Sequence, residues 1–432
     1  MSNNKKKVSI ITLGCAKNLV DTEFLVGGLK SNNFDVVEKA ETSDTVIINT
    51  CGFIDKAREE SVDTILELGR LRKDGSIKQL IAMGCFTDRY GDEVVEEIPE
   101  LDAVFGSEDH ANVLGYLTGK EFSKNDPDFQ RSLLTPNHYA YLKISEGCDN
   151  GCSFCSIPIM RGLQQSQPIR WNVMEAARLA EQGVKEILVI GQDTTSYGWD
   201  LDVKAGLHNL FDELDKIDKV EWLRLHYAHP AHLNIKMIER FSTLEKLIPY
   251  IDMPVQHGSD KMLKDMRRGL GVDGIKRRID ALRNANPDIA IRTSIIVGFP
   301  GETEKDFNHL LDFISEIEFD RLGVFTYSEE EGTYGADALD DNVAAEVKEN
   351  RREEVMLLQQ KINHKKNLGL VGTTQRVLID MCNSQGVSFG RTYRDSPEID
   401  NYVKIKEEID SGVFCDVKIT EAEEYDLVGE RC

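Results

Sequence analysis

Three closely spaced cysteines are the clearest chemical feature of the sequence. Cys148, Cys152 and Cys155 follow the spacing Cys-x-x-x-Cys-x-x-Cys, directly after an apolar, strand-like run. Thiolates this close together bind one soft metal centre, such as an iron–sulfur cluster or zinc. A structural zinc site uses four protein ligands, and no other Cys or His lies between Lys143 and Leu207. The spacing therefore predicts a metal cluster with one position open to a small molecule; a zinc knuckle or a disulfide is the alternative.

A second set of three cysteines is spread over the first part of the chain. Cys15, Cys51 and Cys85 each directly follow a short apolar run that reads as a β-strand. The three runs are residues 8–14, 45–50 and 79–84. In open α/β sheets the ligand crevice lies at the carboxyl ends of the strands, so these cysteines are expected to converge. The pattern predicts a second cluster with three protein ligands, although a cysteine after a strand is often only a buried, small apolar residue.

The elements that position these cysteines divide the chain into three parts and indicate an α/β protein. Residues 1–125 alternate β-branched runs with amphipathic stretches, which is typical of a parallel sheet covered by helices. After a polar linker around residues 122–136, residues 136–364 contain six predicted strands alternating with helices. Six units are too few for a closed eightfold barrel, so we expect a partial (βα)6 barrel, open on one side. Residues 365–432 contain short β runs that predict a small antiparallel β-barrel.

Composition limits the class of protein. The net charge of −23 disfavours binding to a phosphate backbone and favours a basic partner. The hydrophobic content of 41% and the absence of a bilayer-length apolar run indicate a soluble protein without a membrane partner. The short apolar run near the N-terminus does not make a signal peptide, so a cytoplasmic location is expected. In a reducing compartment the nine cysteines are ligands or buried thiols.

The first cysteine triplet resembles the signature of the radical S-adenosylmethionine (AdoMet) enzymes. The resemblance includes Phe154, the aromatic residue before Cys155, which we assign to the cofactor site. It implies that Cys148, Cys152 and Cys155 bind a [4Fe-4S] cluster whose free iron holds the amino and carboxyl groups of AdoMet. The cluster then cleaves AdoMet reductively to a 5′-deoxyadenosyl radical.

The same resemblance suggests which residues contact AdoMet. Gly191, Gln192 and Asp193 end the second strand, where these enzymes usually carry a Gly-Gly-Glu-Pro-like motif that receives the AdoMet amino group. The sequence departs from that motif, but an amide and a carboxylate still accept hydrogen bonds. Arg224 is expected to pair with the AdoMet carboxylate, and Gly298 to let the backbone approach the adenine. Ordinary turns and a surface ion pair are the alternatives for these residues.

The whole chain resembles the methylthiotransferase family of radical AdoMet enzymes. The resemblance implies that Cys15, Cys51 and Cys85 bind an auxiliary [4Fe-4S] cluster that carries the sulfur, and that the C-terminal part is a TRAM-like substrate-binding domain. One branch of the family modifies the β-carbon of an aspartate in ribosomal protein S-twelve, and the other modifies an adenosine in tRNA. Residues 192–198 and 391–400 look like the protein-modifying branch, whereas Gln167 stands where that branch is expected to have arginine.

These observations predict a transferase that uses AdoMet both as methyl donor and as radical source. The partners implied are ribosomal protein S-twelve as substrate and an electron donor such as a flavodoxin-type protein; tRNA is a substrate only under the alternative. Residues 365–432 carry nine Lys and Arg against thirteen Asp and Glu, a net charge of −4 that suits a basic protein substrate. Asp395, Glu398 and Asp400 are expected to attract that substrate. A binding scaffold with structural zinc is the alternative of a different class.

Overall fold

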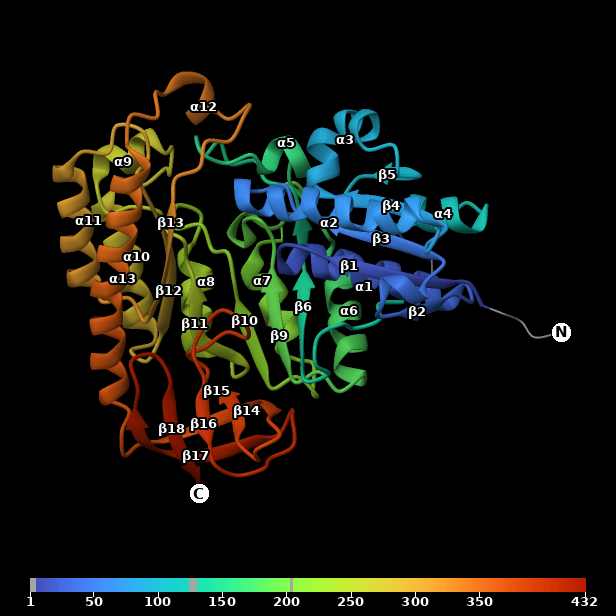
Figure 1. The fold of residues 1–432 in the computed structure, drawn as a ribbon. Helices are drawn as coiled ribbons and strands as arrows, with labels where there is room; N and C mark the ends of the chain where they lie inside the picture. Colours follow the sequence, from blue (N-terminus) through green and yellow to red (C-terminus); the bar gives the residue numbers. More distant parts are fainter. Residues whose placement is uncertain (1–4, 124–129, 203–204) are drawn as a thin grey trace. The chain divides into compact units, whose positions relative to one another are not determined.

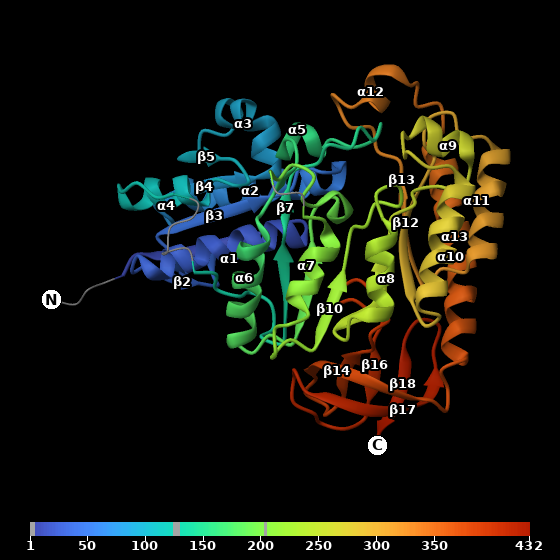
Figure 2. The ribbon, with the colours of Figure 1, turned by 180° about the vertical axis from the view of Figure 1, so that it is seen from behind.

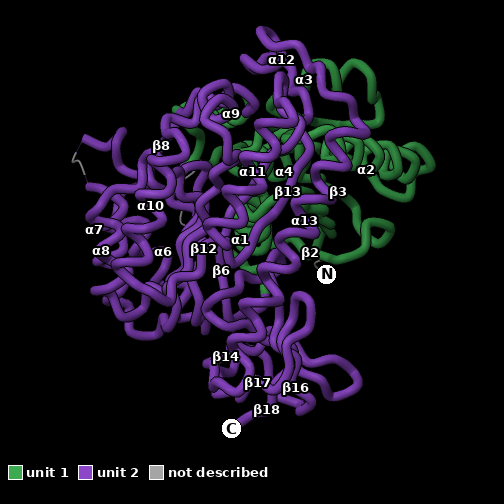
Figure 3. Tube along the Cα trace, turned by 90° about the vertical axis from the view of Figure 1, so that its left-hand side faces the viewer, with its two compact units in different colours: residues 1–135, 146–149, 156–163 green, residues 136–145, 150–155, 164–432 purple. Residues whose placement is uncertain are grey.

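Two compact units make up the computed structural model, which describes residues 5–123, 130–202 and 205–432 (Figure 3). Unit 1 contains residues up to 135 together with 146–149 and 156–163, and unit 2 contains the rest. The division falls within the cysteine-rich loop, because Cys148 belongs to unit 1 whereas Cys152 and Cys155 belong to unit 2.

The predicted linker around residues 122–136 is only partly described, since residues 124–129 lie outside the described residues. The stretch that follows packs within unit 1. Arg131 forms an ion pair with Glu23 at 2.5 Å, and both side chains are buried. The backbone N–H of Leu134 also donates to Glu23. The second half of the expected linker is therefore fixed against the first helix.

Within its described residues, unit 1 contains a five-stranded parallel sheet in the order β2-β1-β3-β4-β5 (Figure 1). The strands are β1 (Lys7–Thr12), β2 (Asp35–Val37), β3 (Thr45–Thr50), β4 (Gln79–Gly84) and β5 (Ala103–Phe105). The helices are α1 (Ala16–Ser31), η1 (Ala40–Thr42), α2 (Asp55–Lys73), α3 (Cys85–Glu97), α4 (His110–Thr118) and α5 (Ile157–Arg161). Every residue of β3 is buried, because alternate side chains pack into one apolar cluster on each face of the sheet: Ile47 into one, Val46 and Ile48 into the other.

In the described part of unit 2, a six-stranded parallel sheet has the order β13-β12-β11-β10-β9-β6, which confirms the predicted open (βα)6 barrel (Figures 1 and 2). The strands are β6 (Tyr139–Lys143), β9 (Glu186–Ile190), β10 (Trp222–Leu225), β11 (Leu247–Asp252), β12 (Ala290–Val297) and β13 (Arg321–Thr326). The helices are α6 (Ile169–Glu181), η2 (Thr194–Ser196), α7 (Leu207–Leu214), α8 (Ile235–Thr243), α9 (Asp260–Asp265), α10 (Val272–Ala285), α11 (Glu304–Ile317), α12 (Tyr334–Ala338) and α13 (Ala345–Leu368). Two short strands, β7 (Ser145–Glu146) and β8 (Gln165–Ser166), flank the cysteine loop.

The C-terminal residues of unit 2 form the predicted small barrel, which is closed in the order β14-β15-β16-β18-β17. Its strands are β14 (Thr374–Cys382), β15 (Ser388–Arg391), β16 (Val403–Ile405), β17 (Phe414–Ala422) and β18 (Leu427–Arg431). The pairing is antiparallel except between β16 and β18, which run parallel. Cys415 is buried in the apolar interior of this barrel. None of the described helices is both long and apolar enough to cross a bilayer.

Two candidate cysteine-ligated metal centres

The three cysteines of unit 1 lie at the carboxyl ends of neighbouring parallel strands. Cys15 follows β1 and precedes α1, Cys51 follows β3, and Cys85 follows β4 as the first residue of α3. The strands β1, β3 and β4 are adjacent in the sheet. Because neighbouring parallel strands end at the same edge, the structure brings together the three cysteines that the sequence pattern singled out.

Two glycines let these strand ends approach one another closely. Gly14 has a φ of +89°, and a Cβ atom there would lie 2.7 Å from the Cβ atom and 2.8 Å from the Sγ atom of Cys51. Gly84 has a φ of +116°, and its Cβ atom would lie 2.4 Å from the carbonyl oxygen of Thr50. Glycine alone adopts positive φ without strain. Both glycines are therefore required by the close packing around Cys51.

Asn18, which the sequence pattern did not reveal, ties two of the strand ends together. Its side-chain amide donates to the carbonyl oxygen of Leu13 at 2.9 Å and to that of Thr50 at 3.0 Å. The residue is fully buried in the first turn of α1. These hydrogen bonds fix the backbone just before Cys15 and Cys51.

The thiols of unit 1 interact electrostatically in a largely buried environment. Burial raises the pKa of Cys85 to about 12, although the positive charge of Arg161 opposes this shift. Burial also raises the pKa of Cys51, and Cys15 raises it further. Metal binding releases the protons of such thiols, because the thiolate is the ligand. The arrangement thus suits a positively charged metal centre better than three free thiolates.

The separation of the sulfur atoms bears on which metal centre fits. Ligands about 2.3 Å from one tetrahedral zinc ion lie roughly 3.8 Å from each other. Among the described residues, Asp193, His229 and His232 form a group whose ligand atoms all lie within 4.8 Å of one another, and the cysteines of unit 1 form no such group. These cysteines are thus not held at the spacing of one tetrahedral ion, and clusters of several irons are the other centre that cysteine thiolates ligate.

Arg161 connects a cysteine of this set to two buried carboxylates, all within unit 1. Its Nε donates to the Sγ atom of Cys85 at 3.1 Å, and its NH1 donates to Glu146 at 2.8 Å. Asp21 accepts from the same guanidinium at 3.3 Å, and the amide oxygen of Asn18 accepts at 2.5 Å. Arg161 could not be recognised from the sequence, because Cys85, Asp21 and Asn18 lie 76, 140 and 143 residues away in the chain.

In unit 2, Ser153 holds the part of the cysteine loop that carries Cys152 and Cys155. The Ser153 N–H donates to the carbonyl oxygen of Met266 at 3.2 Å, and its hydroxyl donates to that of Asp265 at 2.7 Å. Phe154 is partly buried and packs against an apolar cluster that contains Met266. The aromatic residue of the signature thus anchors the loop by packing.

A second arginine contacts a cysteine of this loop. NH1 of Arg268 donates to the Sγ atom of Cys152 at 3.2 Å, and NH2 donates to the carbonyl oxygen of Pro254 at 2.7 Å. Arg268 lies just beyond the end of α9 and is only 5% exposed. Like Arg161, it was not found from the sequence, since neither partner is a neighbour in the chain.

Asp193, at the end of β9, is buried in a hydrogen-bonded cluster. Its Oδ2 accepts from Asn150 at 2.8 Å and lies 2.6 Å from Nδ1 of His232, and its Oδ1 accepts from the backbone N–H and hydroxyl of Thr195. Burial opposes ionisation, but the hydrogen bonds from His232 and Thr195 hold the pKa of Asp193 below its usual value. Burial lowers the pKa of His229 to about 3, so this ring is neutral.

Gly191 lies where β9 approaches the start of the cysteine loop. A Cβ atom at Gly191 would be 2.8 Å from the hydroxyl of Ser145. The next residue, Gln192, is partly buried, and Asp193 after it is buried. The expected Gly191-Gln192-Asp193 motif therefore lies at a strand end beside Asn150 of the cysteine loop.

The expectation for Arg224 requires correction. Its side chain is fully buried, and Nε pairs with Glu186 at 2.7 Å while NH1 donates to the carbonyl oxygen of Tyr393 at 2.8 Å. Glu186 is the first residue of β9, so Arg224 contacts the opposite end of that strand from Asp193. Arg224 therefore joins the barrel to the C-terminal domain and is not placed to pair with AdoMet.

Gly298 also differs from expectation. It has a φ of +73°, but a Cβ atom there would lie 2.2 Å from Cγ of Lys348 in α13. The space beside this glycine is thus filled by a side chain of the protein. Gly298 is required for helix packing, and the structure does not show it opening the backbone to a flat ring.

The acidic loop between β15 and β16 differs most from the expectation based on the sequence. Asp395 pairs with Arg321 at 2.8 Å, and both side chains are buried. Asp400 accepts from the hydroxyl of Tyr250 at 2.8 Å and from Arg292 at 3.3 Å. Only Glu398 is exposed, and it accepts a hydrogen bond from Tyr139. The loop binds the barrel of its own chain, so Asp395 and Asp400 do not face a substrate.

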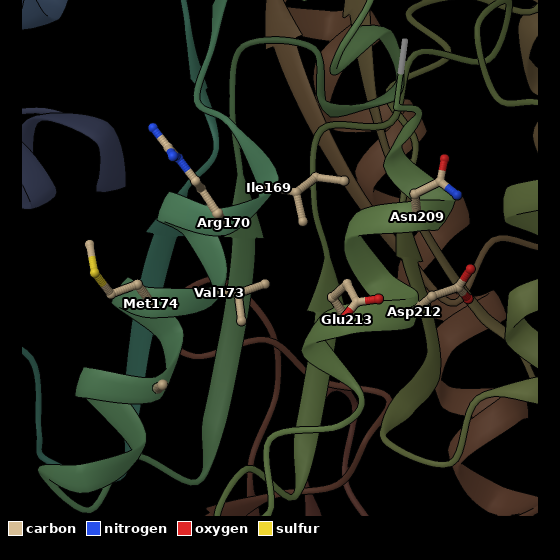
Figure 4. Close-up of a pocket in the computed structure, with 8 residues that line it drawn as sticks. Ile169, Arg170, Val173, Met174, Asn209, Asp212 and Glu213 are labelled. Atoms are coloured by element: carbon tan, nitrogen blue, oxygen red, sulfur yellow. The ribbon is translucent and has the colours of Figure 1, made fainter. Parts of the chain in front are cut away.

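A groove of about 700 Å³ lies between α6 and α7 (Figure 4). Ile169 and Val173 contribute apolar surface from α6, and Asp212 and Glu213 line it from α7. Asp212 is paired with Arg240 at 2.7 Å. The groove is formed by outer helices of the barrel and contains none of the site residues predicted from the sequence.

Three family models match the chain. They are the uncharacterized protein family UPF0004 over residues 7–106, the radical SAM superfamily over residues 142–314 and the TRAM domain over residues 371–432. The first match spans Cys15, Cys51 and Cys85, and the second spans the other cysteine triplet.

Solved structures with related folds include the radical AdoMet methyltransferase TsrM from Kitasatospora setae, with a TM-score of 0.55 and 12% identity over 92% of this chain and 80% of that one. The cobalamin-dependent AdoMet radical enzyme OxsB gives a TM-score of 0.53 at 13% identity over 83% and 56%. At these identities the likeness concerns the fold alone.

Curated relatives match along nearly the entire length. Ribosomal protein uS12 methylthiotransferase RimO of Acetivibrio thermocellus is 43% identical over 99% of this chain and 98% of its own. The Aquifex aeolicus protein of the same name is 45% identical over 98% and 96%. The Clostridioides difficile protein, also of this name, is 43% identical over 98% of each chain. The chain therefore belongs to the ribosomal protein uS12 methylthiotransferase family.

Proposed function

We propose that this protein is a radical AdoMet methylthiotransferase that adds a methylthio group to the β-carbon of an aspartate in ribosomal protein uS12. The observation that carries the proposal is the full-length match to relatives named for this activity, at 43% identity or more. The two cysteine triplets supply a chemical reason for the match. A zinc-binding scaffold would leave the six cysteines of the two triplets unexplained.

The cofactors are two [4Fe-4S] clusters and AdoMet. Cys15, Cys51 and Cys85 would hold the auxiliary cluster, and Cys148, Cys152 and Cys155 would hold the cluster that binds AdoMet. When bound, these groups supply the reductive cleavage of AdoMet and the sulfur to be transferred. The protein holds the cysteines in place through Asn18, Arg161, Ser153 and Arg268.

Gly191 and Gln192 remain our candidates for contact with AdoMet, because they lie at a strand end of the radical AdoMet barrel. Asp193 has a different role in this proposal. Its two oxygens already have four hydrogen-bonding partners, which is about the number a carboxylate accepts. We assign Asp193 the positioning of Asn150, and hence of the cysteine loop.

The C-terminal barrel is the proposed docking domain for the basic substrate. Its exposed acidic residues support this role: Glu407, Glu408, Asp410, Asp416, Glu421, Glu424 and Glu430. We assign to these exposed residues, and no longer to the buried Asp395 and Asp400, the attraction of Lys and Arg side chains of the substrate. An external electron donor, such as a flavodoxin-type protein, would reduce the clusters in the cytoplasm, where ribosomes assemble.

The test is anaerobic reconstitution with iron and sulfide, followed by reaction with AdoMet and a chemical reductant such as dithionite, and mass spectrometry of purified uS12 and of bulk tRNA from the same reaction. We expect one aspartate of uS12 to gain a methylthio group in place of a hydrogen, and the tRNA to remain unmodified. A methylthio-adenosine in the tRNA together with unmodified uS12 would overturn the proposal. The Cys51→Ala variant is the matched control, since it should bind AdoMet without modifying uS12.

A further inference from the structure

In each cysteine set, a buried arginine contacts one of the sulfur atoms. Arg161 donates from Nε to Cys85 at 3.1 Å in unit 1, and Arg268 donates from NH1 to Cys152 at 3.2 Å in unit 2. The two residues are 8% and 5% exposed. In both cases the acceptor is the sulfur of a proposed cluster ligand, so the two sites share one arrangement.

Arg268 carries a buried positive charge that no carboxylate among the described residues neutralises. Among the described residues it forms no ion pair with a carboxylate, and its Nε has no hydrogen-bond partner. In the part of the chain that the structure describes, its hydrogen-bond acceptors are the sulfur of Cys152 and the carbonyl oxygen of Pro254. Buried charges require a partner of opposite sign. A thiolate-ligated cluster at Cys152 would supply that negative charge.

Arg161 is held rigidly in its orientation. Glu146 and Asp21 accept hydrogen bonds from it, and their side chains are 5% and 4% exposed. A guanidinium stays protonated in proteins, and these two carboxylates hold it in place. Arg161 is therefore a fixed positive charge within hydrogen-bonding distance of Cys85.

A positive charge at this distance affects the redox equilibrium of a cluster. Reduction adds one negative charge to the cluster, and a buried cation stabilises that charge more strongly than it would in water. Hydrogen bonds to the sulfurs and the net charge are among the factors that set the reduction potential of an iron–sulfur cluster. Removing such an arginine should lower the potential.

We propose that Arg161 and Arg268 are positioning residues that separately set the reduction potentials of the auxiliary cluster and the AdoMet-binding cluster. Each acts through the one cysteine that accepts its hydrogen bond. This inference rests on the proposed function, because it requires both clusters. It goes beyond that function in assigning to two residues the relative ease with which the clusters are reduced.

The test uses two full-length proteins that each retain one cluster. One carries Cys148→Ala, Cys152→Ala and Cys155→Ala, and the other carries Cys15→Ala, Cys51→Ala and Cys85→Ala. Arg161→Gln is placed in the first and Arg268→Gln in the second, and midpoint potentials are measured without AdoMet by redox titration monitored by electron paramagnetic resonance. We expect each substitution to lower the potential of the cluster it contacts. Arg170→Gln, which removes an exposed arginine, should change neither.

Two further variants keep the outcome interpretable. Arg161→Gln leaves Glu146 and Asp21 without their cation, so the paired variant Arg161→Gln/Glu146→Gln removes one carboxylate as well. Arg161→Lys keeps the positive charge but loses the planar guanidinium. The potential of the auxiliary cluster in this variant should lie between those of the parent protein and Arg161→Gln.

The inference is overturned if iron content is full and the potentials do not move. It is also overturned for Arg268 if Arg268→Gln weakens AdoMet binding while leaving the potential unchanged. Absence of iron–sulfur clusters from the unsubstituted protein would instead contradict the proposed function.

Discussion

Arg391, the last residue of β15, forms an ion pair with Glu186, the first residue of β9, at 2.8 Å, and neither side chain is exposed to solvent. Glu186 also accepts from Arg224, and Arg391 also pairs with Asp380 at 2.7 Å. Although burial opposes its ionisation, Arg391 and Arg224 hold the pKa of Glu186 below its usual value. The C-terminal barrel is thus joined to the base of the larger barrel by buried charges.

Removing one partner of this network should destabilise the protein. Arg391→Ala leaves Glu186 and Asp380 without a cation they need in a buried site, so we expect a loss of about 3–5 kcal/mol in the free energy of unfolding. Urea unfolding monitored by circular dichroism measures it. Arg376→Ala is the control: its pair with Glu221 is half exposed, and the expected loss is under about 1 kcal/mol. Equal losses would contradict the role given to Arg391.

The stability of the folded protein should depend on pH through His229. Burial, assisted by the charge of Arg268, lowers its pKa to about 3 from 6.5. Below pH 6.5 the unfolded chain binds a proton that the folded protein does not, so stability decreases as the pH falls, by up to about 1.4 kcal/mol per pH unit. Above pH 6.5 the ring is neutral in both states.

His229→Gln should therefore lose less stability than the parent protein on acidification. The measurement is urea unfolding at pH about 7.5 and about 5, with the difference compared between variants. His309→Gln, at an exposed position, serves as the control. Identical pH dependence in His229→Gln and the parent protein would show that another group is responsible.

The close packing at Gly14 gives a prediction for metal loading. An alanine there would place its Cβ atom 2.8 Å from Sγ of Cys51 and would also strain a φ of +89°. Gly14→Ala should reduce the iron bound by unit 1 to well below half of the parent value. Gly75→Ala has a similar φ of +81° but nothing within 4 Å of the added atom, and should retain full iron content. Iron and acid-labile sulfide analysis distinguishes the clash from backbone strain.

The two cysteine sets should differ in function. Cys152→Ala is expected to abolish reductive cleavage of AdoMet, measured as 5′-deoxyadenosine by liquid chromatography. Cys51→Ala should retain that cleavage and lose methylthio transfer to uS12, because its set would hold only the sulfur-carrying cluster. Complete loss of cleavage in a folded Cys51→Ala protein would argue against two separate roles.

Substrate docking can be tested on the exposed acids of the C-terminal barrel. We expect Glu407→Lys/Glu408→Lys to weaken uS12 binding several-fold, and the difference from the parent to shrink as salt is added. Glu239→Lys, an exposed site on α8, should have little effect. Titration calorimetry at two salt concentrations gives the affinities.

The sequence predicted features that depend on local patterns. Strand-end cysteines could be recognised because β-branched runs indicate strands, and parallel strands end at one edge of a sheet. Arg224 was misassigned because its partners are 38 and 169 residues away, and a lone arginine carries no sign of burial. Asp395 and Asp400 appeared to be surface charges for the same reason. Arg161 was missed because its contact with Cys85 spans 76 residues.

The buried ion pairs at the base of the larger barrel limit how this enzyme can be recombined with others. A chimera that receives residues 371–432 from a tRNA-modifying relative would import a foreign loop opposite Glu186, Arg292 and Arg321. These three residues would then face side chains that they do not match, and the hybrid would be expected to misfold before its specificity could be tested. To change the substrate preference by transferring the C-terminal domain, the larger barrel would therefore have to be redesigned at these three positions.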